Sequence, residues 1–188
     1  MKLLISFLTL SMLLFADIRL PQDFKTDFHQ TITNDKGKVI KYDGNVFFKN
    51  SEQLFTNMMG EENSYTRSLF KWSYTSPTQK EVCTDGTQLI VVDHDLEQVS
   101  TYLINDGINL EEILKIANMI SAKEYQATYK EIEYLISLDE KEQLKQIVYV
   151  DNLDNNVKII FNNMNYNTTV SENALECNAP QEYDVIKG

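Results

Sequence analysis

The most regular pattern in this 188-residue sequence lies at Leu69-Phe70-Lys71-Trp72-Ser73-Tyr74-Thr75. Its even positions, Phe70, Trp72 and Tyr74, are all aromatic, whereas the odd positions after Leu69 are polar. Side chains alternate between the two faces of a β-strand, so this period of two predicts a strand that buries one face. The three rings therefore point the same way and are expected to form part of an apolar inner surface.

The residues that follow predict an antiparallel meander. Pro77 ends the first strand, and 81–84 begin a second. Asp85-Gly86 forms a tight turn, and 89–92 continue as an apolar strand before 93–95 turn again. The order is L-F-x-W-x-Y-x-x-P, a strand ending in D-G, an apolar strand, and then D-x-D-L-E-Q-V. In this order the stretch resembles the LolA-type periplasmic lipoprotein carriers.

Two more motifs carry the same resemblance, which covers nearly the whole chain after residue 16. F-x-x-x-F-x-Q at 24–30 resembles the opening of the family's first strand, and G-x-V-F-x-K at 44–49 matches its second. In the strand at 38–49 the even face is expected to be buried. Further strands are expected at 97–104, 124–130, 131–138, 144–150, 157–163 and 175–177. The turn at 151–156 lacks the glycine and the terminal glutamate of a calcium loop, so it is expected to be a hairpin tip and not a metal site.

One helix is expected after the meander. Asn109 is a suitable N-cap with Glu112 three residues later, and apolar residues follow at helical spacing as far as Ile120. From composition alone, this helix could close an ordinary core or cover a cavity. The resemblance favours the cavity and implies a mainly β fold with few helices. This fold is a strongly curved, incompletely closed antiparallel β-barrel, capped by a helical lid over an apolar cavity.

The sequence departs from the family pattern in two places. Only the short segment 17–23 precedes the first strand, so we expect a smaller lid than the family's. Where carriers have a tight hairpin, this chain inserts 50–68, with Leu54-Phe55 and Met58-Met59. We expect a flap packed on the sheet edge, although a partner or lipid contact is the alternative. Arg67 lies near the family's lid-contacting arginine, and the resemblance gives it that role.

The N-terminal residues predict export. Lys2 and the apolar run 3–15, followed by Ala16, are typical of a secretory signal peptide at 1–16, leaving 17–188 as a single domain in the periplasm. The formal net charge is −11, and removing the leader takes away Lys2 and no acid. This acidity argues against nucleic acid and against anionic lipid surfaces, although it also serves solubility. A protein partner should therefore present a basic rim.

Cys83 and Cys177 are the only cysteines. In an oxidising compartment an even pair favours a disulfide, and the alternative is two thiols packed as small apolar groups. Each is expected to lie in a strand.

Catalytic motifs are absent from the sequence: His29 and His94 have no paired nucleophile or carboxylate pattern, and there is no phosphate-cradling loop. We therefore expect a binding protein and not an enzyme, without cofactor or metal.

The resemblance implies a monomeric carrier that takes lipoprotein acyl chains from an inner-membrane ABC transporter and delivers them to the outer membrane, to an acceptor where one exists. A lipid- or lipoprotein-sensing scaffold of the same fold is the main alternative. An outer-membrane acceptor is the second, and the lack of an anchor cysteine counts against it. The expected lipid-binding residues are Val46, Phe48, Phe70, Trp72, Tyr74, Ile90, Val92, Leu103, Ile113, Leu114, Ile116, Ala117 and Ile120.

Overall fold

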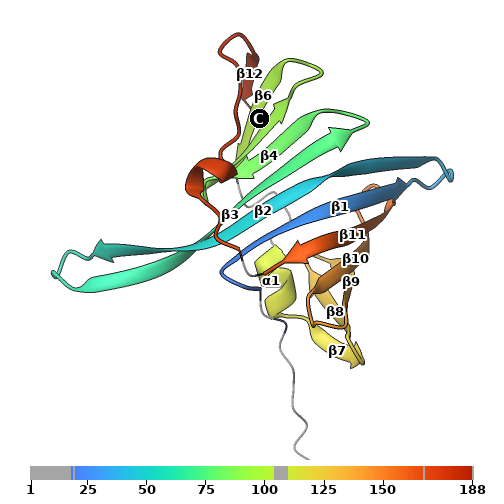
Figure 1. Cartoon of the computed structure of the whole chain (residues 1–188), viewed down its shortest axis with the longest axis horizontal. Coiled ribbons are helices and arrows are strands. Elements are labelled where there is room, and N and C mark those ends of the chain that lie inside the picture. The colour runs from blue at the N-terminus through green and yellow to red at the C-terminus, as the bar shows by residue number, and fades with distance from the viewer. Residues whose placement is uncertain (1–17, 19, 104–109, 167, 188) are drawn as a thin grey trace, which may run out of the picture.

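Twelve strands of the chain form one sheet in the computed structural model, which describes residues 18, 20–103, 110–166 and 168–187 (Figure 1). The predicted signal peptide and the predicted N-cap at Asn109 lie outside the described residues. The strands are β1 (Asp23–Thr33), β2 (Val39–Thr56), β3 (Glu62–Ser76), β4 (Lys80–Thr84), β5 (Gln88–Asp93), β6 (Gln98–Leu103), β7 (Asn118–Ser121), β8 (Glu124–Tyr129), β9 (Ile132–Leu138), β10 (Leu144–Val150), β11 (Asn156–Asn165) and β12 (Asp184–Lys187). The helices are α1 (Leu110–Lys115) and the 3₁₀ helix η2 (Glu172–Leu175).

The strand order is β12-β6-β5-β4-β3-β2-β1-β11-β10-β9-β8-β7, so β12 and β7 are the two edges of an open sheet. The sheet curves strongly, and α1 lies inside the curve against β8 (Figure 1). The predicted mainly β, incompletely closed fold is thus confirmed. One detail differs, because β12 pairs with β6 in parallel and the sheet is not wholly antiparallel.

Four hairpins are closed by the same polar device. In the β1–β2 turn, the Asn34 side-chain oxygen accepts from the backbone N–H of Lys36 and Lys38 at 3.1 and 2.8 Å, and Gly37 has φ 77°. Asn57, Asp139 and Asp151 repeat this pattern at the β2–β3, β9–β10 and β10–β11 turns. A side-chain oxygen that replaces backbone acceptors fixes each turn and hence the register of its strands. The acidic segment 151–156 is accordingly a hairpin tip, as predicted.

The main core lies on the concave side of the sheet. β1 alternates with buried Phe24 and Phe28 on one side and exposed Lys25 and Asp27 on the other. Its buried partners come from β2, from β8 to β11 and from α1: Val46, Phe48, Ile113, Leu114, Tyr125, Ala127, Tyr134, Ile136, Leu144, Ile147, Val157, Ile159 and Phe161, joined by Ile18. The even face of β2 is thus the buried one, as expected.

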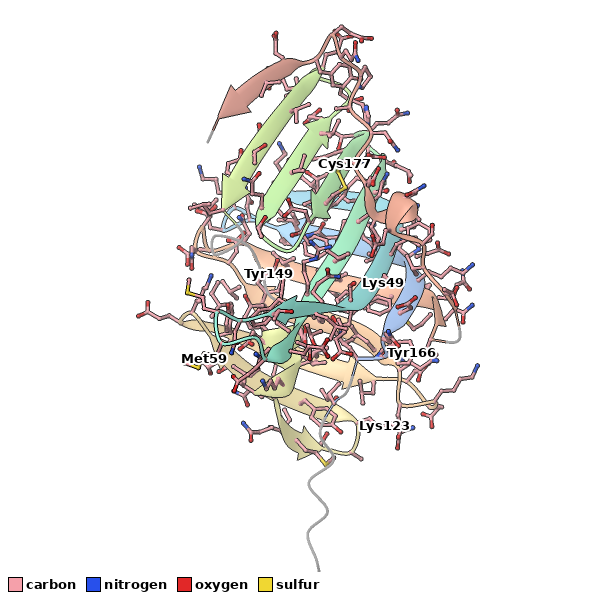
Figure 2. All side chains as sticks on the ribbon, turned by 90° about the vertical axis from the view of Figure 1, so that its left-hand side faces the viewer. Lys49, Met59, Lys123, Tyr149, Tyr166 and Cys177 are labelled. Carbon is pink, nitrogen blue, oxygen red and sulfur yellow. A yellow bond between two sulfur atoms is a disulfide. The ribbon has the colours of Figure 1, made fainter. Side chains whose placement is uncertain are left out.

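A C-terminal segment covers the convex side of β2 and β3. Val170 and Leu175 pack on Leu69, and the Lys71 ammonium donates to the backbone oxygen of Glu176 at 2.9 Å. Cys177 and Cys83 form a disulfide with an S–S distance of 2.02 Å (Figure 2). The expected strand at 175–177 is wrong, because the chain there leaves η2 and lies across the sheet.

The helix is shorter than predicted, and β7 begins at Asn118. The backbone N–H of Ala117 bonds to Leu114 O, three residues back, which tightens the last turn. Residues 118 and 119 then pair with Gln126 and Tyr125 of β8. The free edge of β8 thus supplies the backbone hydrogen bonds that a longer helix would have made, and local apolar spacing does not reveal this competition. No helix among the described residues has the length and apolar character needed to cross a bilayer.

The segment 50–68 is not a flap, so that prediction is wrong. β2 and β3 stay paired from Asn50↔Ser68 to Thr56↔Glu62 and project beyond the rest of the sheet (Figure 1). Residues 50–68 are called the projecting hairpin below. Leu54 is 77% exposed and Met59 86% exposed, so nothing in the described part of the chain covers them.

Candidate functional site

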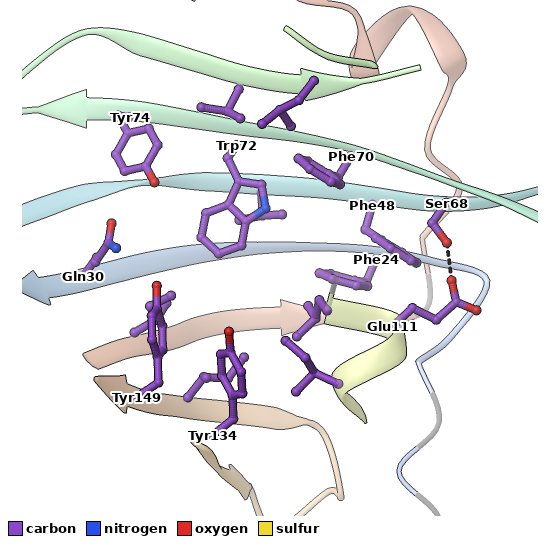
Figure 3. A pocket seen from close by; sticks show the side chains of 17 residues that line it. Phe24, Gln30, Phe48, Ser68, Phe70, Trp72, Tyr74, Glu111, Tyr134 and Tyr149 are labelled. Carbon is purple, nitrogen blue, oxygen red and sulfur yellow. Dashed lines mark hydrogen bonds between the residues drawn. The ribbon is translucent and has the colours of Figure 1, made fainter. Parts of the chain in front are cut away.

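A cavity of about 240 Å³ lies between the concave face of the sheet and α1 (Figure 3). Its lining is mostly apolar and aromatic. The lining residues are Phe24, Gln30, Val46, Phe48, Ser68, Phe70, Trp72, Tyr74, Val82, Leu89, Leu110, Glu111, Ile113, Tyr134, Ile147, Tyr149 and Ile159.

The aromatic wall follows from alternation on β3 and from one glycine beside it. Phe70, Trp72 and Tyr74 stand on the same face, opposite Phe48, Val46 and Gly44 of β2. A Cβ at Gly44 would lie 2.7 Å from the Phe28 ring and 2.0 Å from Ser73 O, so only glycine lets the Phe28 ring sit there. The Phe28 ring then packs 5.0 Å from that of Trp72 and 5.2 Å from that of Tyr74, between centroids. The Phe28 ring therefore supports Trp72 and Tyr74 from the side, on the same concave face.

Helix α1 forms the facing wall and is tied to the base of the projecting hairpin. Ile113 lines the cavity and Leu114 packs in the core, both almost fully buried. The Ser68 hydroxyl donates to the Glu111 carboxylate and is also 2.8 Å from Asn50 Oδ1 (Figure 3). This polar contact links α1 to β3 across the edge of the cavity.

Six of the expected lipid-binding residues line the cavity together: Val46, Phe48, Phe70, Trp72, Tyr74 and Ile113. Leu114 and Ala117 lie nearby in or against the core cluster. Ile116 and Ile120 are 42% and 53% exposed, because the helix ends before them. Neither residue lines this cavity.

Ile90, Val92 and Leu103 were also expected in the lining, and the register shows why they are not there. Phe70 is opposite Thr84, which is opposite Leu89, and Leu89 in turn is opposite Tyr102. The inner face of β5 therefore carries odd-numbered residues. Ile90 and Val92 share the outer face with Cys83, and Leu103 shares it with Gln88, because a shift of one residue exchanges the faces of a strand.

Arg67 does not make the expected lid contact among the described residues. It stands on the convex face, since it alternates with Ser68, and its side chain packs over Gly86, where an added Cβ would lie 2.0 Å from Arg67 Cγ. The residue of the projecting hairpin that reaches α1 is Ser68.

The sequence analysis missed the part of the lining that comes from β1 and from β9 to β11. Gln30, Tyr134, Tyr149 and Ile159 belong to this part. Tyr134 alternates with exposed residues on β9, so the period of two carried the signal, but only the pairing of Tyr149 with Tyr134 places both on the concave face.

The charge of the lining is confined to one place. Glu111 is the only charged residue among the described lining residues, and it accepts a hydrogen bond from Ser68. Burial, and then the nearby Tyr42, raise the pKa of Tyr74 to about 12, so its phenol stays neutral. The cavity suits an uncharged, apolar ligand.

Comparisons with known proteins agree with this geometry. The family described as "Outer membrane lipoprotein carrier protein LolA" matches residues 67–177. An outer-membrane lipoprotein carrier protein of Campylobacter jejuni is 30% identical over 98% of this chain and 97% of its own length. One of Wolinella succinogenes is 27% identical over 87% of this chain and 86% of its own. An uncharacterized conserved protein of Thermus thermophilus shares the fold, with a TM-score of 0.50 at 10% identity over 90% of this chain and 92% of its own. By its matched residues and its relatives, this chain belongs to the LolA family of outer membrane lipoprotein carrier proteins.

Proposed function

We propose that this protein is a periplasmic carrier that holds the acyl chains of lipoproteins in the cavity between the aromatic sheet face and α1. The observation that carries the proposal is an apolar cavity, with a wall formed by a single short helix, in a member of the LolA family. Each methylene that enters such a cavity gains about 0.8 kcal/mol, so acyl chains supply the binding energy.

Loading requires α1 to move. The cavity of about 240 Å³ is smaller than the roughly 300–1,000 Å³ typical of pockets for drug-sized ligands. Several acyl chains therefore fit only when α1 leaves the sheet. Filling the cavity with lipid favours the open form, whereas the buried Ile113 and the Ser68–Glu111 contact favour the closed one. This opposition keeps net affinity low enough for the cargo to be handed on.

The proposed partners are the acyl chains, an inner-membrane lipoprotein-releasing ABC transporter, and an outer-membrane acceptor where one exists. The protein acts as a monomer, after removal of residues 1–16, and performs no chemistry on its cargo. Its acidity suits partners with a basic rim and disfavours nucleic acid.

Mass spectrometry of the protein purified from periplasm tests the proposal. Without detergent, we expect a fraction of the folded protein to carry a triacylated N-terminal cysteine peptide after proteolysis. A variant with a larger cavity and no added charge, Ile113→Ala, should still carry cargo. Folded protein that never carries acylated species, even when the acceptor is depleted, would contradict the proposal.

A further inference from the structure

Besides the Ser68–Glu111 contact beside α1, the cavity lining has a second polar group of side chains, at the opposite end, which its apolar character does not explain. Tyr74, Tyr134 and Tyr149 point their hydroxyls into the same space as the Gln30 amide (Figure 3). These groups come from β3, β9, β10 and β1 and are called the tyrosine cluster. Tyr134 and Tyr149 stand opposite each other on β9 and β10, with ring centroids 5.0 Å apart. At the other end lie Phe24, Phe48 and Phe70, next to α1 (Figure 3).

Within the described part of the chain, the hydrogen-bonding capacity of this cluster is unused. No hydrogen bond between described residues involves the three hydroxyls or the Gln30 amide, although Tyr134 is only 2% and Gln30 9% exposed. Tyr166 differs, because its hydroxyl accepts from the Leu144 N–H at 3.0 Å. Among the described residues, the fully enclosed side-chain atoms without a partner are Asp23 Oδ1 and Arg67 Nε, so the cluster's polar atoms face open cavity space. Donors kept nearly dry and unpaired are costly unless a ligand or water satisfies them.

The cluster offers neutral donors. Burial raises the pKa of all three phenols, that of Tyr74 to about 12, so each keeps its proton at neutral pH. The described lining contains no lysine, arginine or histidine to balance an anion. The acceptors that fit best are therefore uncharged oxygens, such as carbonyls.

We propose that the tyrosine cluster is a subsite for the ester and amide carbonyls at which fatty chains join a lipid's glyceryl or amine group. The chains then extend from the cluster towards Phe48, Phe70 and α1. This inference rests on the proposed function and adds to it the orientation of the lipid and a recognised chemical group.

Two matched probes test the inference on the intact protein. One is a diacylglyceryl-cysteine peptide with ester-linked chains, and the other is its dialkyl analogue, with ether links and the same chain length. Trp72 is the only tryptophan and lines the cavity, so its fluorescence reports filling. We expect the ester probe to bind about tenfold more tightly, as one or two net hydrogen bonds would give.

The variant is Tyr74→Phe/Tyr134→Phe/Tyr149→Phe, which removes three oxygens and no hydrogen bond between described residues. It should lower affinity for the ester probe to within about twofold of that for the ether probe, whose own affinity should not change. Tyr42→Phe is the control, since Tyr42 packs 5.7 Å from Tyr74 but does not line the cavity. If the triple variant does not melt cooperatively, each single variant should still lower the ester-to-ether ratio by about twofold.

Equal affinity of the native protein for both probes, or a ratio unchanged in the variants, would overturn the subsite and leave the carrier function intact. Failure of both probes to change Trp72 fluorescence would overturn the carrier function as well.

A phosphatidylethanolamine with the same chains identifies the source of the carbonyls. It should bind more weakly than the lipopeptide, because the described lining has no cation for its phosphate. Tighter binding of the phospholipid would overturn the assignment to lipoprotein esters.

Discussion

Strands β2 and β3 run without interruption through two regions that differ in what covers them. The first region, here called the covered half, is 44–49 of β2 and 69–74 of β3, which pair with the neighbouring strands β1 and β4. There Phe48 is 3% exposed and Phe70 lines the cavity. In the projecting hairpin the same two strands carry Leu54 and Phe55 at 77% and 47% exposure. The backbone ladder is equally regular in both, with pairing from Gly44↔Tyr74 to Thr56↔Glu62.

The difference shows that regular backbone pairing between two strands does not by itself bury their side chains. The covered half has neighbours on both faces: the concave core with α1, and the C-terminal segment with η2 on the convex side. Beyond its base, where Ser68 contacts Glu111 and Arg67 packs over Gly86, the projecting hairpin has in the described part of the chain only its own turn, closed by Asn57 and Gly60. Because apolar burial drives folding, stability should reside almost wholly in the covered half. The predictions below measure that contrast.

The largest effect is expected from the disulfide that holds the C-terminal segment on the covered half. Cys83→Ser/Cys177→Ser opens a link between residues 94 apart in sequence. The chain-entropy model gives a loss of about 4–5 kcal/mol in unfolding free energy. Urea unfolding of oxidised protein and double variant measures it, and two titratable thiols per denatured, unreduced native chain would contradict the link.

A matched pair of phenylalanines should give the next largest contrast. Phe28 is 1% exposed and packs beside Trp72 and Tyr74, so Phe28→Ala should lower the free energy of unfolding by about 3–5 kcal/mol. Phe55 touches only Tyr65 among ring contacts of the described residues, and Phe55→Ala should cost about 0.5 kcal/mol or less. Similar losses of unfolding free energy in thermal melts of the two variants would contradict the difference in stability between the covered half and the projecting hairpin.

Two glycines sharpen the comparison at the backbone. Gly44→Ala would place a Cβ 2.0 Å from Ser73 O, and the backbone shift should cost about 3 kcal/mol. Gly60 has φ 81° with open space around it, so Gly60→Ala should cost only the left-handed conformation, about 1–2 kcal/mol. Denaturant midpoints give both values, and a larger loss at Gly60 would mean that the projecting hairpin contributes more than its contacts indicate.

The smallest effect is expected at the tip. Met58→Ser/Met59→Ser replaces side chains that are 108% and 86% exposed. Thermal melts should show a change in the free energy of unfolding of about 0.5 kcal/mol or less, as expected of surface substitutions. A clear loss of stability would show that these methionines are covered in solution.

Local alternation was sufficient to predict the covered half. The rings at Phe70, Trp72 and Tyr74, the even face of β2 and the hairpin tip at 151–156 follow from the period of two and from turn chemistry. The predictions that failed depended on how one segment pairs with another. The helix ended early because β8 offered an edge to Asn118, and Ile90 changed faces through the register of β4. The outer part of the projecting hairpin stayed uncovered, because nothing in the described chain packs on Leu54 or Met59. The apolar spacing within one segment does not show which neighbouring strand that segment will pair with, or in which register.

The central claim is that cargo binds in the covered half, against Phe70, and it is tested most directly by release of lipoproteins from inner membranes. Phe70 is half-buried at the cavity, so Phe70→Glu should let the charge reach water and keep a cooperative melt while preventing acyl chains from binding. Phe55→Glu adds the same charge on the projecting hairpin and is the control. The account predicts no release by folded Phe70→Glu and near-native release by Phe55→Glu. Normal release by a folded Phe70→Glu protein would contradict it.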